Sequence, residues 1–293
     1  MKKTKLYMDT VVDIQVVTRK SREETEAKIN RAFHAFQKVE QACSRFTSSS
    51  ELMQACQKVG TPVEISPFLF EPLFFAIEIA KLTEGLFDPT VGKIMEEGGF
   101  NRHYVTGKII ESPSSASVSY QDIVLNPQTH TLTLRKPLVI DLGAVAKGFA
   151  IDLAAKELKE FDGFVVNAGG DLFAGGVDQN GDPWNIGIQH PQQKDTIIGS
   201  IKISDEAICT SGSYERRNPN RLGSHHLVNP KTKQSPNEWT SCSVIAPFAM
   251  MADAFSTVSF LLGVKKGRSL LKELNLKGFL ITPELQISKV GGI

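Results

Sequence analysis

The order of strand-like and helix-like segments along the chain is the feature that most constrains its fold. Residues 8–18 are rich in Val and Ile and alternate in polarity, which predicts a strand. A helix is expected to follow from Ser21, with Glu24 completing a capping box. Further strands are expected as a short pair within 121–140 and at 164–166, 184–189, 197–203 and 242–246, and further helices from Ser66-Pro67, up to Leu158, at about 250–262 and at 264–274. Because strands and helices mix without a regular βαβ alternation, we predict an α+β fold rather than a doubly wound parallel sheet.

The chain length limits how this fold can be divided. With 293 residues, the chain can form one large domain or two intimately packed lobes. It contains no internal repeat, low-complexity tract or linker-like segment that would mark a domain boundary. We therefore expect a single domain over residues 1–293.

Charge and hydropathy restrict the partners and the location of the protein. The 33 basic and 32 acidic residues nearly cancel, so no overall field attracts nucleic acid or an anionic membrane surface. The four cysteines form no CxxC pair, which favours reduced thiols in the core over a zinc site. No segment is long and apolar enough to be a transmembrane helix. We expect a cytoplasmic protein, or an extracytoplasmic or membrane-anchored one if an export signal has been removed.

A glycine-bordered turn around Lys147 is the first segment with the chemistry of a binding site. In residues 141–150, DLGAVAKGFA, small side chains let a ligand approach the backbone closely. If a helix begins near Ala144, its free amide groups form a cradle for phosphate, and Lys147 adds a positive charge. Asp141, at the preceding strand end, is a candidate to bind a ligand hydroxyl or ring nitrogen. A tightly packed strand–helix turn without a ligand is the alternative, and these residues alone favour neither.

Oxygen-bearing side chains share one face of the helix expected at about 250–262. Asp253 and Thr257 are four residues apart, with Ser256 beside them among apolar neighbours. A carboxylate in such surroundings is costly to bury without a partner. Magnesium would supply one, because it prefers carboxylate, hydroxyl and carbonyl oxygens and leaves positions for phosphate. We favour a magnesium site over the alternative, in which Asp253 caps the helix or interacts with its dipole.

Two further polar segments are candidates for the same site. Residues 167–171, NAGGD, indicate an unusual backbone turn near a ligand or another strand, although a structural anchor role for Asp171 is favoured. Residues 210–216 form a hydroxyl-rich turn with a basic end, and His226 enters a strand that stops at Asn229. A histidine near a phosphate site can act as a base or contact the anion, whereas a lone histidine is more often a surface or satisfied residue.

Taken together, five segments in this order resemble the FAD:protein FMN transferase family, often called the ApbE family, over almost the whole chain. They are DLGAVAKGFAID, VVNAGGDLFAGG, CTSGSYERR, HHLVNP and MADAFSTVSFLLG. The resemblance implies an ApbE-like fold, with a mixed, largely antiparallel sheet core and flanking helices. It also implies a magnesium-dependent enzyme that cleaves FAD, attaches FMN through a phosphoester to a Thr or Ser hydroxyl of an acceptor flavoprotein, and releases AMP.

The resemblance also implies roles for individual residues. Magnesium ligands are expected at Asp253, at Thr257 and at the Ala144 carbonyl, with Ser256 at or beside the metal. Contacts with FAD are expected from Met8, Phe46, Leu86, Phe87, Asp88, Asp141, Lys147 and His226. His226 is the candidate general base, and a metal-linked carboxylate is the runner-up.

Three positions depart from the family pattern. Asp9 stands where the family commonly has Gly, and this change is expected to alter the flavin entrance. Ala144 replaces a common glycine, but a contact through the backbone carbonyl survives that change. Asn229 stands where the family usually has Asp before Pro230. Because an asparagine cannot be an ionised base, no such role is expected at this position.

Three other functions use the same residues differently. An FAD pyrophosphatase would have the same site, with water in place of the acceptor hydroxyl. A non-catalytic flavin-binding or storage protein would hold FAD intact, although Asp253, Thr257 and Lys147 argue against it. A scaffold without a ligand would gain no thermal stability from FAD.

Overall fold

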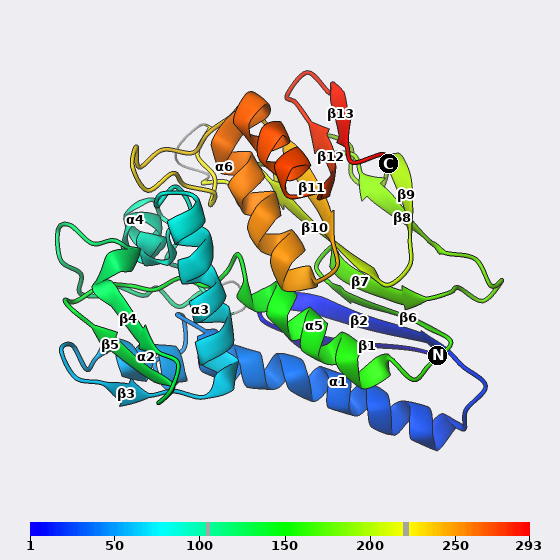
Figure 1. Cartoon of the computed structure of the whole chain (residues 1–293), viewed down its shortest axis with the longest axis horizontal. Coiled ribbons are helices and arrows are strands. Elements are labelled where there is room, and N and C mark those ends of the chain that lie inside the picture. The colour runs from blue at the N-terminus through cyan, green and yellow to red at the C-terminus, as the bar shows by residue number, and fades with distance from the viewer. Residues whose placement is uncertain (104–105, 219–222) are drawn as a thin grey trace.

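A computed structural model describes residues 1–103, 106–218 and 223–293 of the chain. Its largest element is an eight-stranded sheet in the order β1-β2-β6-β7-β10-β11-β12-β13 (Figure 1). The strands are β1 (Lys2–Tyr7), β2 (Thr10–Val17), β6 (Gly163–Ala168), β7 (Asp171–Gly176), β10 (Glu206–Gly212), β11 (Ser241–Ala246), β12 (Lys277–Ile281) and β13 (Ile287–Val290). Every neighbouring pair in this sheet is antiparallel. The predicted α+β fold with a largely antiparallel core is confirmed.

Three helices cover one face of this sheet: α1 (Arg22–Cys43), α5 (Ala146–Leu158) and α6 (Ala249–Glu273) (Figure 1). Alternate residues of β2, namely Val12, Ile14 and Val16, are buried in the same core cluster as the apolar faces of these helices. The predicted capping box at Ser21 is present, because its hydroxyl accepts from the Glu24 N–H and the Glu24 carboxylate accepts in return. The alternation of β2 and the cap of α1 therefore orient the first strand and helix as the sequence indicates.

The opposite face of the sheet is partly covered by a hairpin of β8 (Trp184–Gln189) and β9 (Ile197–Ile203), both with the predicted bounds. Its apolar side chains form a second cluster with Leu172 and Ala174 of β7. Phe173, between these two residues, belongs to the cluster on the helix side. The period-two alternation of β7 thus gives the sheet a core on each face.

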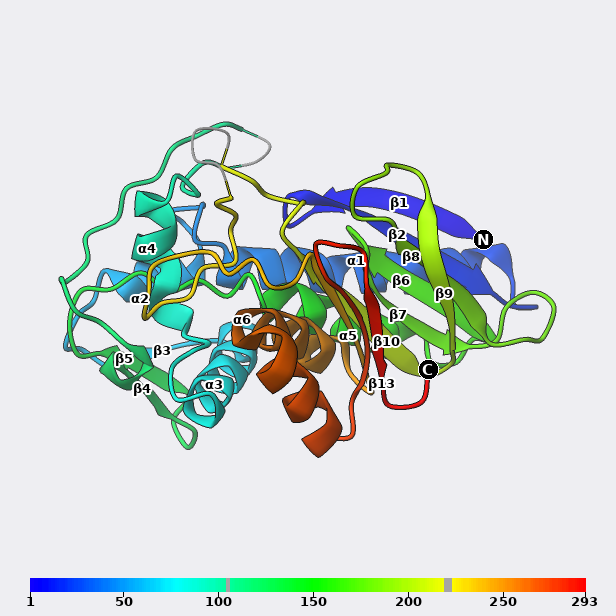
Figure 2. The same cartoon turned by 90° about the horizontal axis from the view of Figure 1, so that it is seen from above.

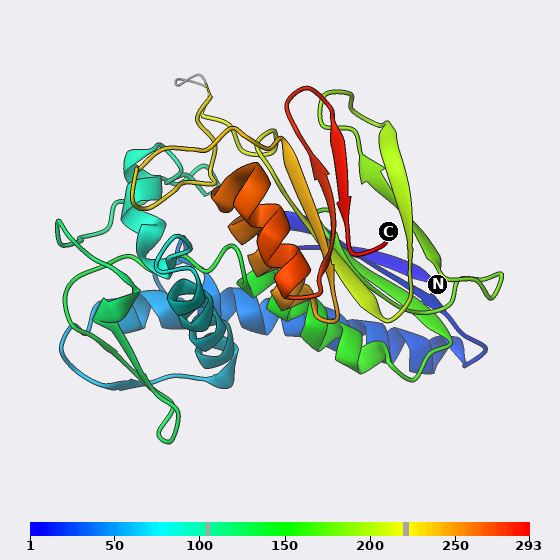
Figure 3. The same ribbon diagram turned by 45° about the horizontal axis from the view of Figure 1, so that its top comes forward.

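A second lobe lies beside the sheet and its helices (Figure 2). It contains α2 (Glu51–Cys56), β3 (Val63–Glu64), α3 (Pro67–Leu82), η1 (Pro89–Val91), α4 (Gly92–Glu97), η2 (Tyr120–Asp122), β4 (Ile123–Asn126) and β5 (Thr131–Leu134). Figure 3 shows α1 extending from beneath the sheet to this lobe. Side chains of both lobes, such as Phe33 of α1 and Leu69 of α3, belong to one hydrophobic cluster. In the described part of the chain, no helix is long and apolar enough to span a membrane.

The segment at residues 8–18 is not one strand, as predicted, but the turn and second strand of a hairpin. Met8 and Asp9 have φ values of 52° and 57°, and β1 pairs with β2 on either side of them. Two successive positive φ angles define a type I′ turn, which usually carries Asn-Gly or Asp-Gly. Met-Asp hides this turn from a sequence reading, but Asp is among the non-glycine residues that adopt the left-handed conformation most readily.

The N-terminal ends of α5 and α6 are tied together by two carboxylates, one from each helix. Asp152 of α5 accepts hydrogen bonds from the first two amides of α6, Ala249 N at 2.7 Å and Met250 N at 2.9 Å. Asp253 of α6 accepts from Gly148 N in the first turn of α5 at 3.2 Å. Because the first amides of a helix lack intrahelical acceptors, each helix supplies the cap of the other.

This reciprocal capping requires a glycine at position 148. A Cβ atom there would lie 2.4 Å from the Ala249 carbonyl oxygen, far inside van der Waals contact. We expect Gly148→Ala to lower the free energy of unfolding by about 1–3 kcal/mol, since the two helices would have to separate. Urea denaturation measures the change. Lys156→Ala, on the exposed side of α5, is the control and should change stability by less than about 0.5 kcal/mol; equal effects of the two substitutions would contradict a tight crossing.

Candidate functional site

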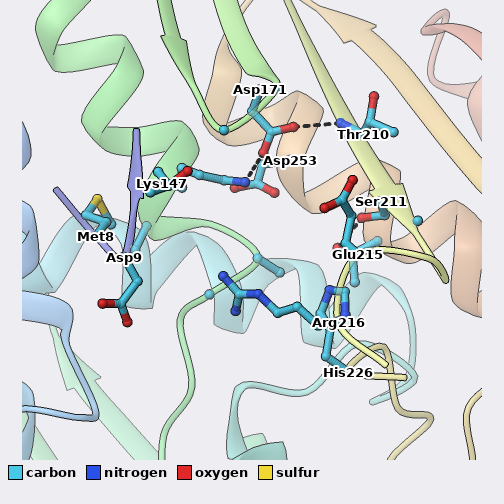
Figure 4. Close-up of a pocket in the computed structure, with 18 of the residues that line it drawn as sticks. Met8, Asp9, Lys147, Asp171, Thr210, Ser211, Glu215, Arg216, His226 and Asp253 are labelled. Atoms are coloured by element: carbon cyan, nitrogen blue, oxygen red, sulfur yellow. Dashed lines mark hydrogen bonds and ion pairs between the residues drawn. The ribbon is translucent and has the colours of Figure 1, made fainter. Parts of the chain in front are cut away.

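A cavity of about 870 Å³ is lined by residues of both lobes and of the sheet, and its size is typical of small-molecule sites (Figure 4). Of the residues predicted for the site, the cavity wall contains Met8, Phe46, Leu86, Phe87, Asp88, Asp141, Ala144, Lys147, His226, Asp253 and Thr257. The structure thus brings Lys147 and Asp253 into one cavity, although they are on different helices. Ser256, the remaining predicted residue, is fully buried beneath the wall.

One charged part of the wall is formed by Lys147, Asp171 and Asp253 (Figure 4). The Lys147 ammonium forms an ion pair with one carboxylate oxygen of Asp171, and the other oxygen accepts from Thr210 N at 2.7 Å. Asp171, at the start of β7, also lines the cavity, and its two bonds fit the anchor role that the sequence favoured. Its partner was not predictable, because the pairing depends on how α5 packs against β7.

Burial and charge act in opposite directions on the ionisable groups of this cluster. Burial raises the pKa of Asp253, and Lys147 opposes that shift. Burial would lower the pKa of Lys147, but Asp171 and then Asp253 outweigh it and raise this pKa above its ordinary value. Lys147 is therefore cationic at neutral pH, and it lies beside the carboxyl groups of Asp171 and Asp253 in the same wall. A cation bound there would favour the ionised form of Asp253 against the effect of burial.

Four oxygen groups were predicted as metal ligands, and three of them are at the cavity wall: the Asp253 carboxylate, the Thr257 hydroxyl and Ala144. The prediction that Ser256 binds the metal is corrected by the structure. The Ser256 hydroxyl donates to the Asp253 carbonyl at 2.8 Å and its side chain has no exposed surface, so it is not placed to bind a metal. The reason is the helical twist, which turns residue 256 toward β10 while 253 and 257 share the cavity-facing side.

The donor set fits magnesium better than a soft metal. Across residues 1–103, 106–218 and 223–293, no three His, Cys, Asp or Glu side chains are grouped as metal ligands. Magnesium does not need such a cage, because it is commonly held by one or two carboxylates together with phosphate oxygens and water. Asp253, Thr257 and Ala144 offer a carboxylate, a hydroxyl and a carbonyl of that kind.

The predicted amide cradle at the start of α5 is only partly available to a ligand. The helix begins at Ala146 rather than near Ala144. Ala146 N donates to the Leu142 carbonyl at 2.8 Å, and Gly148 N donates to Asp253. These two amides are used within the protein, so the positive charge for an anion at this point comes from Lys147.

Arg45 was not predicted, yet it organises another part of the wall. Its guanidinium is buried, donates from Nε to Asp141 at 2.5 Å and lies over the Phe46 ring, 4.3 Å from the centroid. The other oxygen of Asp141 accepts from Gly143 N at 2.8 Å. Arg45 therefore holds Asp141 and Phe46, both predicted to contact the ligand, in fixed positions. Its place directly before Phe46 is the one sequence feature that could have suggested this.

Asp88 shapes the wall of the cavity through its hydrogen bonds. One carboxylate oxygen accepts from the amide and the hydroxyl of Thr90, both at 2.8 Å, and the other accepts from Tyr120 N at 3.0 Å. These bonds fix the turn that carries Leu86 and Phe87 on the same wall. Both carboxylate oxygens of Asp88 already have partners within the protein. The expected contact between Asp88 and FAD stays a prediction.

Met8 reaches the cavity from the tip of the β1–β2 hairpin. The Met8 amide donates to the Glu40 carboxylate of α1 at 2.8 Å, and the Asp9 carboxylate lies 3.3 Å from Nδ1 of His103. The family glycine expected at position 9 is therefore replaced by a side chain that connects the hairpin tip with the second lobe.

His226 lies beside Arg216 in the cavity wall (Figure 4). The His226 amide donates to the Arg216 carbonyl at 3.1 Å. Burial lowers the pKa of His226 to about 3, and the positive charge of Arg216 contributes. The imidazole is therefore neutral at physiological pH, and its Nδ1 is buried without a hydrogen-bond partner among the residues that the structure describes.

Asn229, the third departure from the family pattern, has a structural role. Its side-chain oxygen accepts from Lys231 N at 2.9 Å and from Thr232 N at 3.3 Å, which forms an Asx turn. Within the described ranges, Asn229 is not among the residues of the cavity wall. Asparagine and aspartate build this turn equally well, so the substitution does not remove a group from the cavity.

Comparison with known proteins finds relatives that match nearly the whole chain. The ApbE family model matches residues 8–280. The chain is 29% identical to an FAD:protein FMN transferase of Haemophilus influenzae, over 92% of this chain and 80% of that protein. It is 30% identical to an FAD:protein FMN transferase of Klebsiella pneumoniae, over 82% of this chain and 73% of that protein. Among solved structures, it is similar to the ApbE protein of Thermotoga maritima, with a TM-score of 0.86, 25% identity and coverage of 99% and 96%. The chain is also similar to the flavinyl transferase ApbE of Pseudomonas stutzeri, with a TM-score of 0.83 and 21% identity, over 99% of this chain and 94% of that one.

Proposed function

Since the chain belongs to the ApbE family, we propose that it is an FAD:protein FMN transferase that depends on magnesium. It would cleave the diphosphate of FAD, attach FMN through a phosphoester to a Thr or Ser hydroxyl of an acceptor flavoprotein, and release AMP. The observation that carries this proposal is the joint presence of Lys147, Asp253 and Thr257 in one cavity. A cationic side chain beside carboxyl groups suits a diphosphate accompanied by a divalent cation.

In the proposed reaction, the acceptor oxygen attacks the FMN-side phosphorus, and the bond from that phosphorus to the oxygen of AMP breaks. Lys147 would contact the diphosphate, while Arg45 holds Asp141 and Phe46 against other parts of FAD. Asp253, Thr257 and the Ala144 carbonyl would hold magnesium, which when bound neutralises phosphate charge. Such a transfer depends mainly on positioning and charge compensation by the protein.

We assign the acceptor proton to His226, which is neutral and so has a lone pair available. Its pKa of about 3, which is set mainly by burial, makes it a weak base in the free protein, and a bound anionic diphosphate would raise this pKa by stabilising the imidazolium. His226→Ala should lower kcat at saturating FAD by about 10²-fold or more. Steady-state kinetics with FAD and acceptor both varied provide the test. An unchanged kcat with a raised KM for FAD would show that His226 only binds the substrate.

The function itself is tested by incubating the protein with FAD, magnesium and a candidate acceptor. Transfer produces a flavin-fluorescent acceptor band that resists denaturation, and mass spectrometry locates FMN on a Thr or Ser. Formation of FMN and AMP at the same rate without acceptor would identify a pyrophosphatase instead. FAD that stays intact through long incubation with magnesium would identify a flavin-binding protein.

A further inference from the structure

At the cavity wall and directly behind it, three hydroxyl groups form a hydrogen-bonded chain between β10 and α6. The Ser211 hydroxyl lies 2.8 Å from that of Ser256 and 3.0 Å from that of Thr257. Ser256 in turn donates to the Asp253 carbonyl at 2.8 Å. All three side chains are at least nine-tenths buried, with exposed fractions of 7%, 0% and 8%. Thr257 and Ser211 line the cavity, whereas Ser256 lies behind them.

The carbonyl at one end of the chain sets the direction of every proton in it. A carbonyl oxygen can only accept, so the single proton of Ser256 points to Asp253. Ser256 must then accept from Ser211, which commits the only proton of Ser211. The contact between Ser211 and Thr257 can therefore be a hydrogen bond only if Thr257 donates. The proton of Thr257 is turned into the protein, and its lone pairs are left for the cavity.

We propose that Ser211 and Ser256 are positioning residues that hold the Thr257 hydroxyl with its lone pairs toward a divalent cation in the cavity. This inference rests on the cation site of the proposed function, but it concerns residues that do not themselves bind the cation. It also gives Ser256 a role: its hydroxyl does not reach the cavity, yet it fixes the orientation of one that does.

The orientation matters because a hydroxyl can face a cation with either end of its dipole. With its proton turned inward, Thr257 presents negative charge to the cavity, as a metal ligand must. If Ser256 loses its hydroxyl, Ser211 can rotate and donate to Thr257, and the Thr257 proton is then displaced toward the cavity. If Ser211 loses its hydroxyl, the Thr257 proton has lost its acceptor. Residues that orient metal ligands in this way commonly change metal affinity by about 10- to 100-fold.

The test is a Mn²⁺ titration of the whole chain followed by electron paramagnetic resonance, which counts free Mn²⁺. Mn²⁺ suits the same oxygen ligands as magnesium. The titration is done alone and with ADP, which supplies a diphosphate but no flavin to transfer. We expect Ser211→Ala and Ser256→Ala each to weaken Mn²⁺ binding by about 10- to 100-fold. Melting temperatures confirm that the variants are folded.

Ser259→Ala is the matched control, because Ser259 is a fully buried serine one turn further along α6. Its hydroxyl has no hydrogen-bond partner within the described residues and is not part of the chain. This variant should bind Mn²⁺ like the wild type. Equal affinities for Ser256→Ala and Ser259→Ala would overturn the inference and leave the proposed transferase intact. If the wild type binds no Mn²⁺ under either condition, the cation site of the proposed function fails, and the inference fails with it.

A double-mutant cycle separates orientation from packing. In a Thr257→Val background the hydroxyl to be oriented is gone, so Ser211→Ala and Ser256→Ala should weaken Mn²⁺ binding no further. The same 10- to 100-fold loss in this background would mean that the two serines act through packing, and it would overturn the inference.

Discussion

Replacing Asp253 by asparagine should lower kcat/KM for FMN transfer by about 10³-fold or more. Asp253 supplies the carboxylate among the proposed magnesium ligands, and neutralisation of phosphate charge by a metal is commonly worth several kcal/mol in such reactions. Asparagine keeps a side-chain oxygen that can still accept from Gly148 N, so the tie between α5 and α6 is retained. The measurement is steady-state kinetics with FAD and acceptor, at magnesium concentrations up to tens of times that needed by the wild type.

Asp152→Asn is the control for this substitution. Asp152 is the other carboxylate of the reciprocal caps, but in the described part of the chain it is not among the residues of the cavity wall. Asparagine keeps one of the two oxygens that accept from the α6 amides, so the substitution weakens this cap without changing the cavity wall. We expect kcat/KM close to that of the wild type. Similar losses for the two variants would mean that Asp253 acts through the helix junction, and full magnesium-dependent activity of Asp253→Asn would remove it from the metal site.

Lys147→Met is expected to have two large effects at once. It removes the positive charge proposed to contact the diphosphate, which should reduce kcat/KM by about 10²- to 10³-fold. It also leaves the Asp171 carboxylate, 3% exposed, without its ion-pair partner. Removing one member of a buried pair typically costs about 3–5 kcal/mol, so the variant should unfold at lower urea concentration. Kinetics and urea denaturation of the same preparation measure both effects.

A second substitution separates the two effects of Lys147. In Lys147→Met/Asp171→Asn the uncompensated charge is removed, while the asparagine oxygen can still accept from Thr210 N. Most of the lost stability should return, but the activity should not. Recovery of activity together with stability would show that Lys147 supports the fold without contacting the substrate.

Local sequence patterns predicted the parts of the fold that depend on neighbours along the chain. The capping box at Ser21, the hairpin strands β8 and β9, and the break between two helical segments at Gly263, where φ is 76°, are set within a few residues. The type I′ turn at Met8-Asp9 was missed because its residues are unusual for that turn. The sequence analysis also missed three elements, namely β7, β10 and the short helix α2. Each begins with an acidic residue, and β7 follows two glycines, so none shows a clear apolar pattern at its start.

The sequence pointed to candidate site residues whose own side chains can bind an anion, a metal or a proton, namely Lys147, Asp253, Thr257 and His226. The partners that give these groups their properties were not predicted. Arg45 meets Asp141 across 96 residues of sequence, Gly148 meets Asp253 across 105, and Ser211 meets Thr257 across 46. Such pairs arise when segments that are far apart in the sequence come together in the fold, and no spacing along the chain encodes them. Ser256 was misassigned for the same reason. Helical spacing shows which residues of α6 lie near one another, but not which element packs against each of them.

The exchange of caps between α5 and α6 restricts how the proposed cation site could be re-engineered for another metal. A designer who replaces Asp253 by histidine or cysteine, to favour a softer ion, also removes the acceptor of the Gly148 amide and loosens the junction of two helices. The choice of ion and the geometry of the scaffold are therefore not separate design variables at this position. A successful redesign would have to begin with a new acceptor for that amide.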